Sequence, residues 1–297
     1  NTSGALWLAE GFTQYYGPLV LHRAGLGDTR STAGRLADLV EAVSVNPGRL
    51  IRSAEEMSRM APFTDGGQPV DRTNWSISVT SYYPLGGAIA LALDLTLRER
   101  SNGQVSLDDF MRAMWRRFGK PGGAREGYVD RPYSMADAEA TLAEVGGDPA
   151  FARDFFARYI QGYDVADYAR LLGRAGFVLR SVRTGAAWLG DLRIDTRNGA
   201  ARVATLVAST WPIYATGVDQ DDEIQQMGGD RIRSIDDVNA VLRRHKPGDR
   251  IEMVFVSRGG APKAASIALG EDPRRDVVPI EAAGGMLTPA QKSFRDA

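Results

Sequence analysis

The stretch LWLAEGFTQYY, residues 6–16, decides how the first part of the chain folds. Its apolar and aromatic side chains recur near helical spacing, which predicts a helix with a buried face. Gly11 lies in the middle of this pattern, where glycine costs about 1 kcal/mol relative to alanine in a helix interior. We therefore expect another element of the fold to approach the helix closely at Gly11.

Helical patterns continue from this stretch towards residue 180. Further helices are predicted over residues 35–45, 86–100, 107–118, 135–145, 149–162 and 165–175. The helix over residues 86–100 is the most apolar of them and should be buried on most sides. Its Asp94 and Arg98 are four residues apart, so they can pair. The apolar run over residues 84–93 is too short for a membrane span, which needs about 20 residues.

The pattern changes after Gly176. Residues rich in β-branched side chains predict strands over 177–182, 201–207, 251–256 and 264–269, with one helix from Ser234 or Asp236 to Arg244. The predicted fold is therefore multidomain α + β. It comprises a mostly α-helical domain over residues 1–180, a small β-rich domain over residues 181–271 and a C-terminal tail over residues 272–297. The tail is rich in proline, glycine and charge, so we expect it to pack loosely.

The composition excludes several classes of function. The chain has 297 residues, which favours two domains, and a net charge of -1, which argues against nucleic-acid binding. It has no cysteine, which excludes disulfides, iron–sulfur clusters and thiol catalysis. Its two histidines, His22 and His245, are far apart in the sequence, whereas a catalytic zinc site usually includes a close histidine pair. This chain cannot form such a site from its own histidines.

Residues 6–16 resemble the second zinc-binding motif of the gluzincin metallopeptidases, which reads Trp-x-x-Glu-Gly-x-Thr-x-Tyr. The resemblance implies that Glu10 is the third zinc ligand, beside two histidines of an H-E-x-x-H helix. Zinc accepts a carboxylate oxygen beside two imidazoles and keeps a fourth position for water. The sequence contains no H-E-x-x-H, so we expect a fragment that binds no Zn²⁺ and is inactive alone. For Glu10 by itself, the alternative is an ordinary glutamate on a helix surface.

Residues 81–87, SYYPLGG, resemble the segment Tyr-x-Lys-Gly of the same enzymes, which opens a buried helix. In gluzincin aminopeptidases this tyrosine donates its hydroxyl to the tetrahedral oxyanion, and a fixed donor of this kind stabilises charge that develops in the transition state. The matching residue is Tyr83, and Tyr82 is the alternative if the register slips by one. Leu85 stands where the family usually has lysine. The competing interpretation is a tyrosine of the core or of an interface.

Residues 188–269 resemble a bacterial protease-type PDZ domain. Within them, residues 201–260 follow the order strand, small-residue helix, strand, Gly-Gly turn, serine-capped helix, Pro-Gly-Asp turn and strand. PDZ domains bind an extended peptide at a sheet edge. The implied peptide-binding residues are Leu189, Gly190, Asp191 and Leu192. Asp191 departs from the family pattern, because its carboxylate would repel a peptide C-terminus unless the side chain points away. A packing module or internal lid is the alternative.

Together with FFARYIQG, residues 155–162, these motifs resemble the glycyl aminopeptidase family of gluzincin zinc metallopeptidases, whose members carry a C-terminal PDZ domain. The resemblance implies the helical C-terminal half of a thermolysin-like catalytic domain, followed by the PDZ module. It implies a bacterial Zn²⁺-dependent aminopeptidase that removes N-terminal residues from peptides. The implied partners are a peptide substrate and, at the PDZ groove, a peptide C-terminus or an internal peptide. The alternatives are a non-enzymatic PDZ adaptor and an endopeptidase. Periplasm, cell envelope and cytoplasm all stay open.

Overall fold

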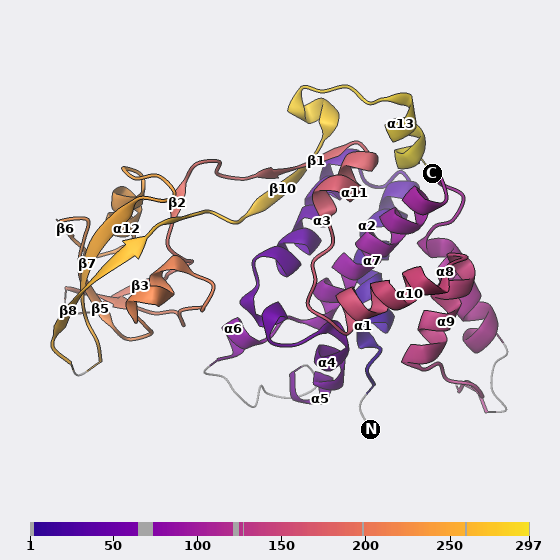
Figure 1. Cartoon of the computed structure of the whole chain (residues 1–297), viewed down its shortest axis with the longest axis horizontal. Coiled ribbons are helices and arrows are strands. Elements are labelled where there is room, and N and C mark those ends of the chain that lie inside the picture. Colours follow the sequence, from indigo (N-terminus) through magenta and orange to yellow (C-terminus); the bar gives the residue numbers. More distant parts are fainter. Residues whose placement is uncertain are drawn as a thin grey trace. The chain divides into compact units, whose positions relative to one another are not determined.

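The computed structural model describes residues 3–64, 74–120, 125–126, 128–197, 199–258 and 260–296. The chain forms two compact units (Figure 1). Unit 1 comprises Asn1–Val70, Val79–Arg180 and Arg275–Ala297, and unit 2 comprises Asp71–Ser78 and Ser181–Arg274. The chain therefore leaves unit 1 after Arg180 and returns to it at Arg275.

Unit 1 is built mainly from helices. These are α1 (Leu6–Ala9), α2 (Gly11–Arg23), α3 (Thr29–Ser44), α4 (Ala54–Arg59), α5 (Ala61–Thr64), α7 (Tyr82–Arg100), α8 (Leu107–Met114), α9 (Met135–Val145), α10 (Pro149–Phe155), α11 (Tyr168–Arg174) and α13 (Pro289–Asp296). The centre of the unit is α7, in which every residue from Leu85 to Leu95 is buried. This confirms the prediction that this helix is buried on most sides. Among the described residues, no helix is both long and apolar enough to cross a membrane.

The predicted helix over residues 6–16 is two helices in the structure. It breaks at Glu10, which lies between α1 and α2 with φ -104° and ψ -39°. The second helix then continues to Arg23 with Pro18 inside it. A proline in a helix interior removes one backbone hydrogen bond and usually ends or kinks the helix. Packing of α2 against α7 and α3 outweighs that loss here.

The end of the chain does not pack loosely, so that expectation was wrong. Strand β10 (Arg275–Pro279) pairs with β1 (Phe177–Ser181), and helix α13 lies against α11 (Figure 1). Val277 is buried in the core of unit 1, and Phe294 packs against that core. The burial of these two apolar side chains outweighs the polar composition around them.

Unit 2 contains an antiparallel sheet with one helix, α12 (Ile235–Leu242), and the short α6 (Trp75–Ser78). Its strands are β2 (Ala187–Trp188), β3 (Ile194–Arg197), β4 (Ala200–Val203), β5 (Glu223–Met227), β6 (Asp230–Arg231), β7 (Arg250–Val256), β8 (Pro262–Ala268) and β9 (Gly270–Glu271). The order in the main sheet is β3-β4-β5-β7-β8, with β6 on β5, while β2 pairs with β9. Ser234 and Asp237 form a capping box that starts α12. Strand β3 therefore lies at an edge of the sheet.

Candidate functional site

Glu10 lies at the break between α1 and α2, with its side chain partly exposed. Its backbone carbonyl accepts a hydrogen bond from the Thr13 hydroxyl. Within the described residues, its carboxylate has neither a hydrogen bond nor an ion pair. The carboxylate is therefore available to a further group.

Gly11 and Gly86 bring the start of α2 against the start of α7. A Cβ placed on Gly86 would lie 2.8 Å from Gly11 Cα, and one placed on Gly11 would lie 2.9 Å from the Tyr82 carbonyl oxygen. Real Cβ atoms essentially never approach other atoms this closely, so only glycine fits both positions. The close approach that the sequence predicted at Gly11 is confirmed, and its partner is α7. The contact joins the residue that follows Glu10 to Gly86, which lies about one helical turn after Tyr83.

The two tyrosines that begin α7 differ in burial. Tyr82 is 4% exposed and belongs to the core, whereas Tyr83 is only partly buried. Their rings stack with centroids 4.8 Å apart, so Tyr82 supports Tyr83 from one side. Ser81 caps the helix by accepting the backbone N–H of Tyr83 at 3.3 Å. Among the described residues, the Tyr83 hydroxyl has no hydrogen-bond partner.

An aromatic cluster fixes the helices that carry these residues. Trp7 meets Phe12 edge-on with ring centroids 5.6 Å apart and meets Phe156 at 5.9 Å. Phe12 also meets Phe110 at 6.3 Å. Edge-to-face aromatic pairs add about 0.5–1.5 kcal/mol each beyond the area they bury. Glu10 is thus attached to a rigid part of the core.

The buried acid Asp94 connects α2, α7 and α8. It accepts hydrogen bonds from the Tyr15 hydroxyl at 2.6 Å, from Arg98 Nε at 3.1 Å and from the Leu107 backbone N–H at 2.8 Å. The predicted pair of Asp94 and Arg98 is therefore confirmed, while the Tyr15 contact was not predicted. Burial, together with the charge of Asp94, raises the pKa of Tyr15 well above its usual value. These hydrogen bonds hold the second turn of α2 against α7.

The described residues alone do not provide the ligands of a catalytic zinc. They contain no group of three or more histidine, cysteine, aspartate and glutamate side chains that could hold a metal ion. His22 lies at the far end of α2, where its Nδ1 is 3.2 Å from the Thr32 hydroxyl. Glu10 therefore fits a zinc site only as one ligand among others that this part of the chain does not supply.

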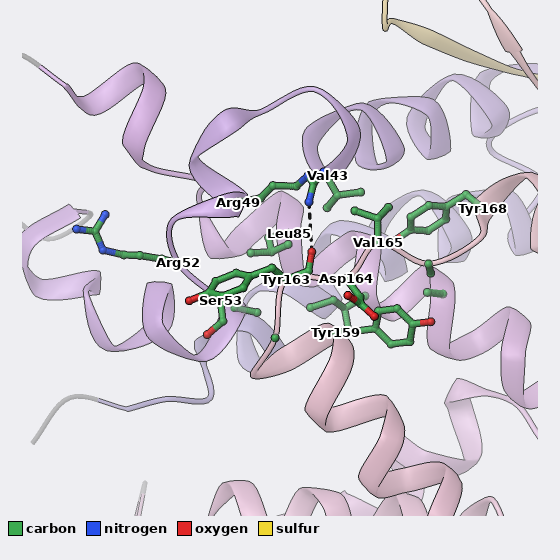
Figure 2. Close-up of a pocket in the computed structure, with 15 residues that line it drawn as sticks. Val43, Arg49, Arg52, Ser53, Leu85, Tyr159, Tyr163, Asp164, Val165 and Tyr168 are labelled. Carbon is green, nitrogen blue, oxygen red and sulfur yellow. Dashed lines mark hydrogen bonds between the residues drawn. The ribbon is translucent and has the colours of Figure 1, made fainter. Parts of the chain in front are cut away.

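Two hollows in unit 1 differ greatly in size. The one drawn in Figure 2 lies beside Arg49, whose Nη1 donates to the Tyr163 carbonyl at 3.2 Å, and it holds only about 20 Å³. That volume suits about one water molecule. A groove of about 550 Å³ lies between α2 and α3 and begins at Thr13 and Gln14, one turn beyond Glu10. Of these two, the groove is the one large enough for a peptide side chain, and no sequence motif indicated it.

The loop after β2 adopts a conformation that depends on glycine. Gly190 has φ +135°, and a Cβ there would lie 2.7 Å from the Trp211 ring. Leu189 and Leu192 are 1% and 8% exposed and belong to the core of unit 2. Their side chains anchor the loop, so at Leu189 and Leu192 only the backbone can meet a peptide. The loop and α12 line a groove of about 890 Å³.

Asp191 is held to one side of this loop. Its Oδ1 accepts a hydrogen bond from Trp188 Nε1 at 3.1 Å and lies 3.8 Å from Arg274 Nη2. Arg274 also donates to the buried Asp272 at 2.8 and 2.6 Å. Burial alone would raise the pKa of Asp272, but these hydrogen bonds from Arg274 lower it. The Asp191 charge is thus partly compensated by Arg274.

Residues 1–89 match the M61 glycyl aminopeptidase family, which confirms the predicted resemblance for the N-terminal region. No curated protein matches the sequence significantly. The structure is similar to that of an aminopeptidase N family protein from Idiomarina loihiensis over 97% of this chain, with a TM-score of 0.72 and 22% identity. The alignment covers 49% of that protein, so this chain spans about half of its length.

Two further alignments cover only the β-rich part. An HtrA-type protease solved with a decapeptide aligns over 31% of each chain, with 18% identity and a TM-score of 0.28. The PDZ domain of a carboxy-terminal protease from Vibrio cholerae, solved with a peptide, aligns over 32% of this chain and 97% of its own length, with 12% identity and a TM-score of 0.23. The fold that the sequence predicted is confirmed. A helical part precedes a small antiparallel β unit.

Proposed function

We propose that this chain is the C-terminal part of a zinc-dependent aminopeptidase that hydrolyses N-terminal residues of peptides. In this proposal Glu10 is one zinc ligand, and the Tyr83 hydroxyl donates a hydrogen bond to the oxyanion of the transition state. The observation that carries it is the contact of Gly11 with Gly86, which brings the backbones beside Glu10 and Tyr83 together. The match of residues 1–89 to the M61 glycyl aminopeptidases supports the same assignment.

The state of both side chains supports these roles. A metal ligand and an oxyanion donor must each keep a free polar group in a rigid setting. Among the described residues, neither the Glu10 carboxylate nor the Tyr83 hydroxyl has a partner, while both backbones are held by buried helices. Tyr83 suits the role better than Tyr82, because Tyr82 is buried in the core. Because the zinc ligands are incomplete in the described residues, we expect this chain alone to bind no catalytic zinc.

Two substitutions test the proposal in the whole protein, which must carry an H-E-x-x-H upstream. Glu10→Gln should reduce the bound zinc per protein strongly, as measured by elemental analysis after dialysis. Tyr83→Phe should retain full zinc and lower kcat for alanine and glycine anilides by at least about a hundredfold, the loss typical of one oxyanion donor. Tyr82→Phe is the matched control and should retain most of the turnover.

Three results would contradict the proposal. The first is a Glu10→Gln protein that keeps its zinc, and the second is a Tyr83→Phe protein that turns over at the wild-type rate. The third is the absence of any H-E-x-x-H upstream, which would favour the non-enzymatic adaptor. Cleavage of internal bonds in peptides with blocked N-termini would instead indicate an endopeptidase.

We also propose that unit 2 binds an extended peptide along β3. Among the described residues, the backbone N–H groups of Gly190, Asp191 and Leu192 donate to no other atom. Strand β3 pairs on one side only, with β4, so its other edge can accept a peptide strand. The groove beside it, lined by the same loop and by α12, has room for alternate side chains of the peptide.

The charge of Asp191 decides which kind of peptide fits. An internal segment needs no carboxylate site, whereas a C-terminus must place its charge near Asp191. Asp191→Asn should therefore strengthen binding of peptides with a free C-terminus and leave amidated peptides unchanged, as measured by fluorescence anisotropy. Equal effects on both peptide types would place Asp191 outside the binding site. Failure of every peptide to bind would favour a packing role for unit 2.

A further inference from the structure

A cavity of about 430 Å³ opens inside unit 1 at the opposite end of α7 from Tyr83. Arg98 lines it, 15 residues after Tyr83 in α7. At 1.5 Å per residue, this separation is roughly 22 Å along the helix. The volume falls within the range of about 300–1,000 Å³ that is typical of small-molecule sites. The cavity is therefore large enough for a ligand and separate from the residues proposed for peptide hydrolysis.

One of the polar groups that line this cavity is the guanidinium group of Arg98. The side chain of Arg98 is 7% exposed, and its Nε donates to Asp94 Oδ1 at 3.1 Å. Among the described residues, its two Nη groups have no partner. These groups keep some contact with solvent, so an acceptor that enters the cavity can reach them. The planar fork of arginine is well matched to a carboxylate, which it can bind through two parallel hydrogen bonds.

The lining also contains two acids, Asp94 and Asp296, and Asp296 is paired with Lys292. Asp94 already accepts three hydrogen bonds, from Tyr15, Arg98 and Leu107. Arg23 is paired with Asp108 at 3.0 Å. Arg98 is thus the arginine of the lining whose Nη groups are still available to a ligand. A single guanidinium group suits an anion with one negative charge better than a phosphate.

The walls of the cavity combine polar residues such as His22 and Thr32 with apolar side chains. Leu19, Leu36, Leu91 and Phe294 contribute side chains from α2, α3, α7 and α13. Phe294 belongs to the C-terminal helix, and its neighbour Arg295 donates to the Ala175 carbonyl at 3.0 Å and pairs with Glu281 at 2.9 Å. These contacts hold α13 in place as one wall. A ligand here needs an apolar body of modest size beside its single charge.

We propose that this cavity binds a small carboxylic acid with an aliphatic tail, whose carboxylate lies on the Nη groups of Arg98 and whose tail lies against the leucines and Phe294. The site is independent of the proposed peptidase activity. Because such a ligand binds only the folded unit, it also stabilises the docking of α13.

The test uses octanoate as the probe, with octan-1-ol and octylamine as probes of equal chain length. Isothermal titration calorimetry on the whole chain should show one saturable octanoate site and at least about tenfold weaker binding of the other two, because they lack the charge-assisted hydrogen bonds. Octanoate should also raise the unfolding midpoint of unit 1. Equal binding of octanoate and octan-1-ol would overturn the proposal, as would the absence of saturable octanoate binding.

Two variants locate the site. Leu19→Trp fills the cavity and should abolish octanoate binding, whereas Leu50→Trp, at a position that is 50% exposed and outside the cavity, should leave it unchanged. Arg98→Lys keeps a positive charge for Asp94 but removes the fork, so it should weaken octanoate binding by about tenfold. Unchanged binding by a folded Leu19→Trp protein would refute the location. If that variant does not fold, the comparison of octanoate with octan-1-ol on the native protein still decides.

Discussion

Replacing Gly86 with alanine should separate α7 from the start of α2 and destabilise unit 1. An ordinary Cβ contact begins at 3.4 Å, whereas the new Cβ would lie 2.8 Å from Gly11 Cα and closer still to the Trp7 carbonyl oxygen. The helices would have to move apart by at least 0.6 Å, the difference between these distances. Overpacking of this kind costs about 1–3 kcal/mol, and a clash with backbone atoms belongs at the upper end. The gain of about 1 kcal/mol from alanine in a helix offsets part of it.

We therefore expect Gly86→Ala to lower the free energy of unfolding of unit 1 by about 1–2 kcal/mol. Gly17→Ala is the matched control, because Gly17 also lies in a helix of unit 1 but has nothing within 4 Å of the new Cβ. It should stabilise the unit by up to about 1 kcal/mol. Urea unfolding followed at 222 nm, where the helices dominate, measures both. A Gly86→Ala protein as stable as Gly17→Ala would refute the close-packing argument.

Three further predictions concern stability. Tyr15→Phe should cost about 1.5–3 kcal/mol in urea unfolding, because it removes a hydrogen bond to the buried charge of Asp94. The pKa of Asp272 is lowered in the folded state, so its contribution is present above the unfolded pKa of about 3.9 and is lost as the pH falls through the folded pKa. Asp272→Asn should therefore flatten the acid dependence of the unit 2 unfolding midpoint, and an unchanged slope would contradict this. Ser234→Ala should lower the stability of unit 2 by about 1 kcal/mol through loss of the α12 cap, as measured by thermal unfolding.

Much of the fold followed from local signals in the sequence. The apolar run of α7, the capping serines and the cost of a glycine inside a helix each predicted a feature that the structure contains. Gly11 was the most informative of these signals, because the stability that a glycine costs a helix must be offset by a favourable contact. The sequence could not identify Gly86 as the partner, since that contact joins residues far apart in the chain.

The features that the sequence did not reveal depend on tertiary packing. The helix break at Glu10 has no proline beside it, and Gly11, which follows it, predicted a close contact and not a break. The helix through Pro18 contradicts the local rule, and packing against neighbours that include α3 and α7 stabilises it. Strand β10 lies in a segment whose composition resembles a loose tail, and its pairing with β1 depends on residues nearly a hundred positions earlier.

The glycine contact also links stability to the proposed chemistry. Glu10 directly precedes α2 and Tyr83 lies in α7, and the close backbone contact between Gly11 and Gly86 helps to set the spacing of these two helices. A misplacement of about 1 Å of catalytic groups can cost a hundredfold in rate. In the whole enzyme, Gly86→Ala should therefore lower kcat by more than its loss of folded protein explains, while zinc content stays close to wild type. A rate that falls only in proportion to the unfolded fraction would show that Tyr83 does not act on the substrate held at Glu10.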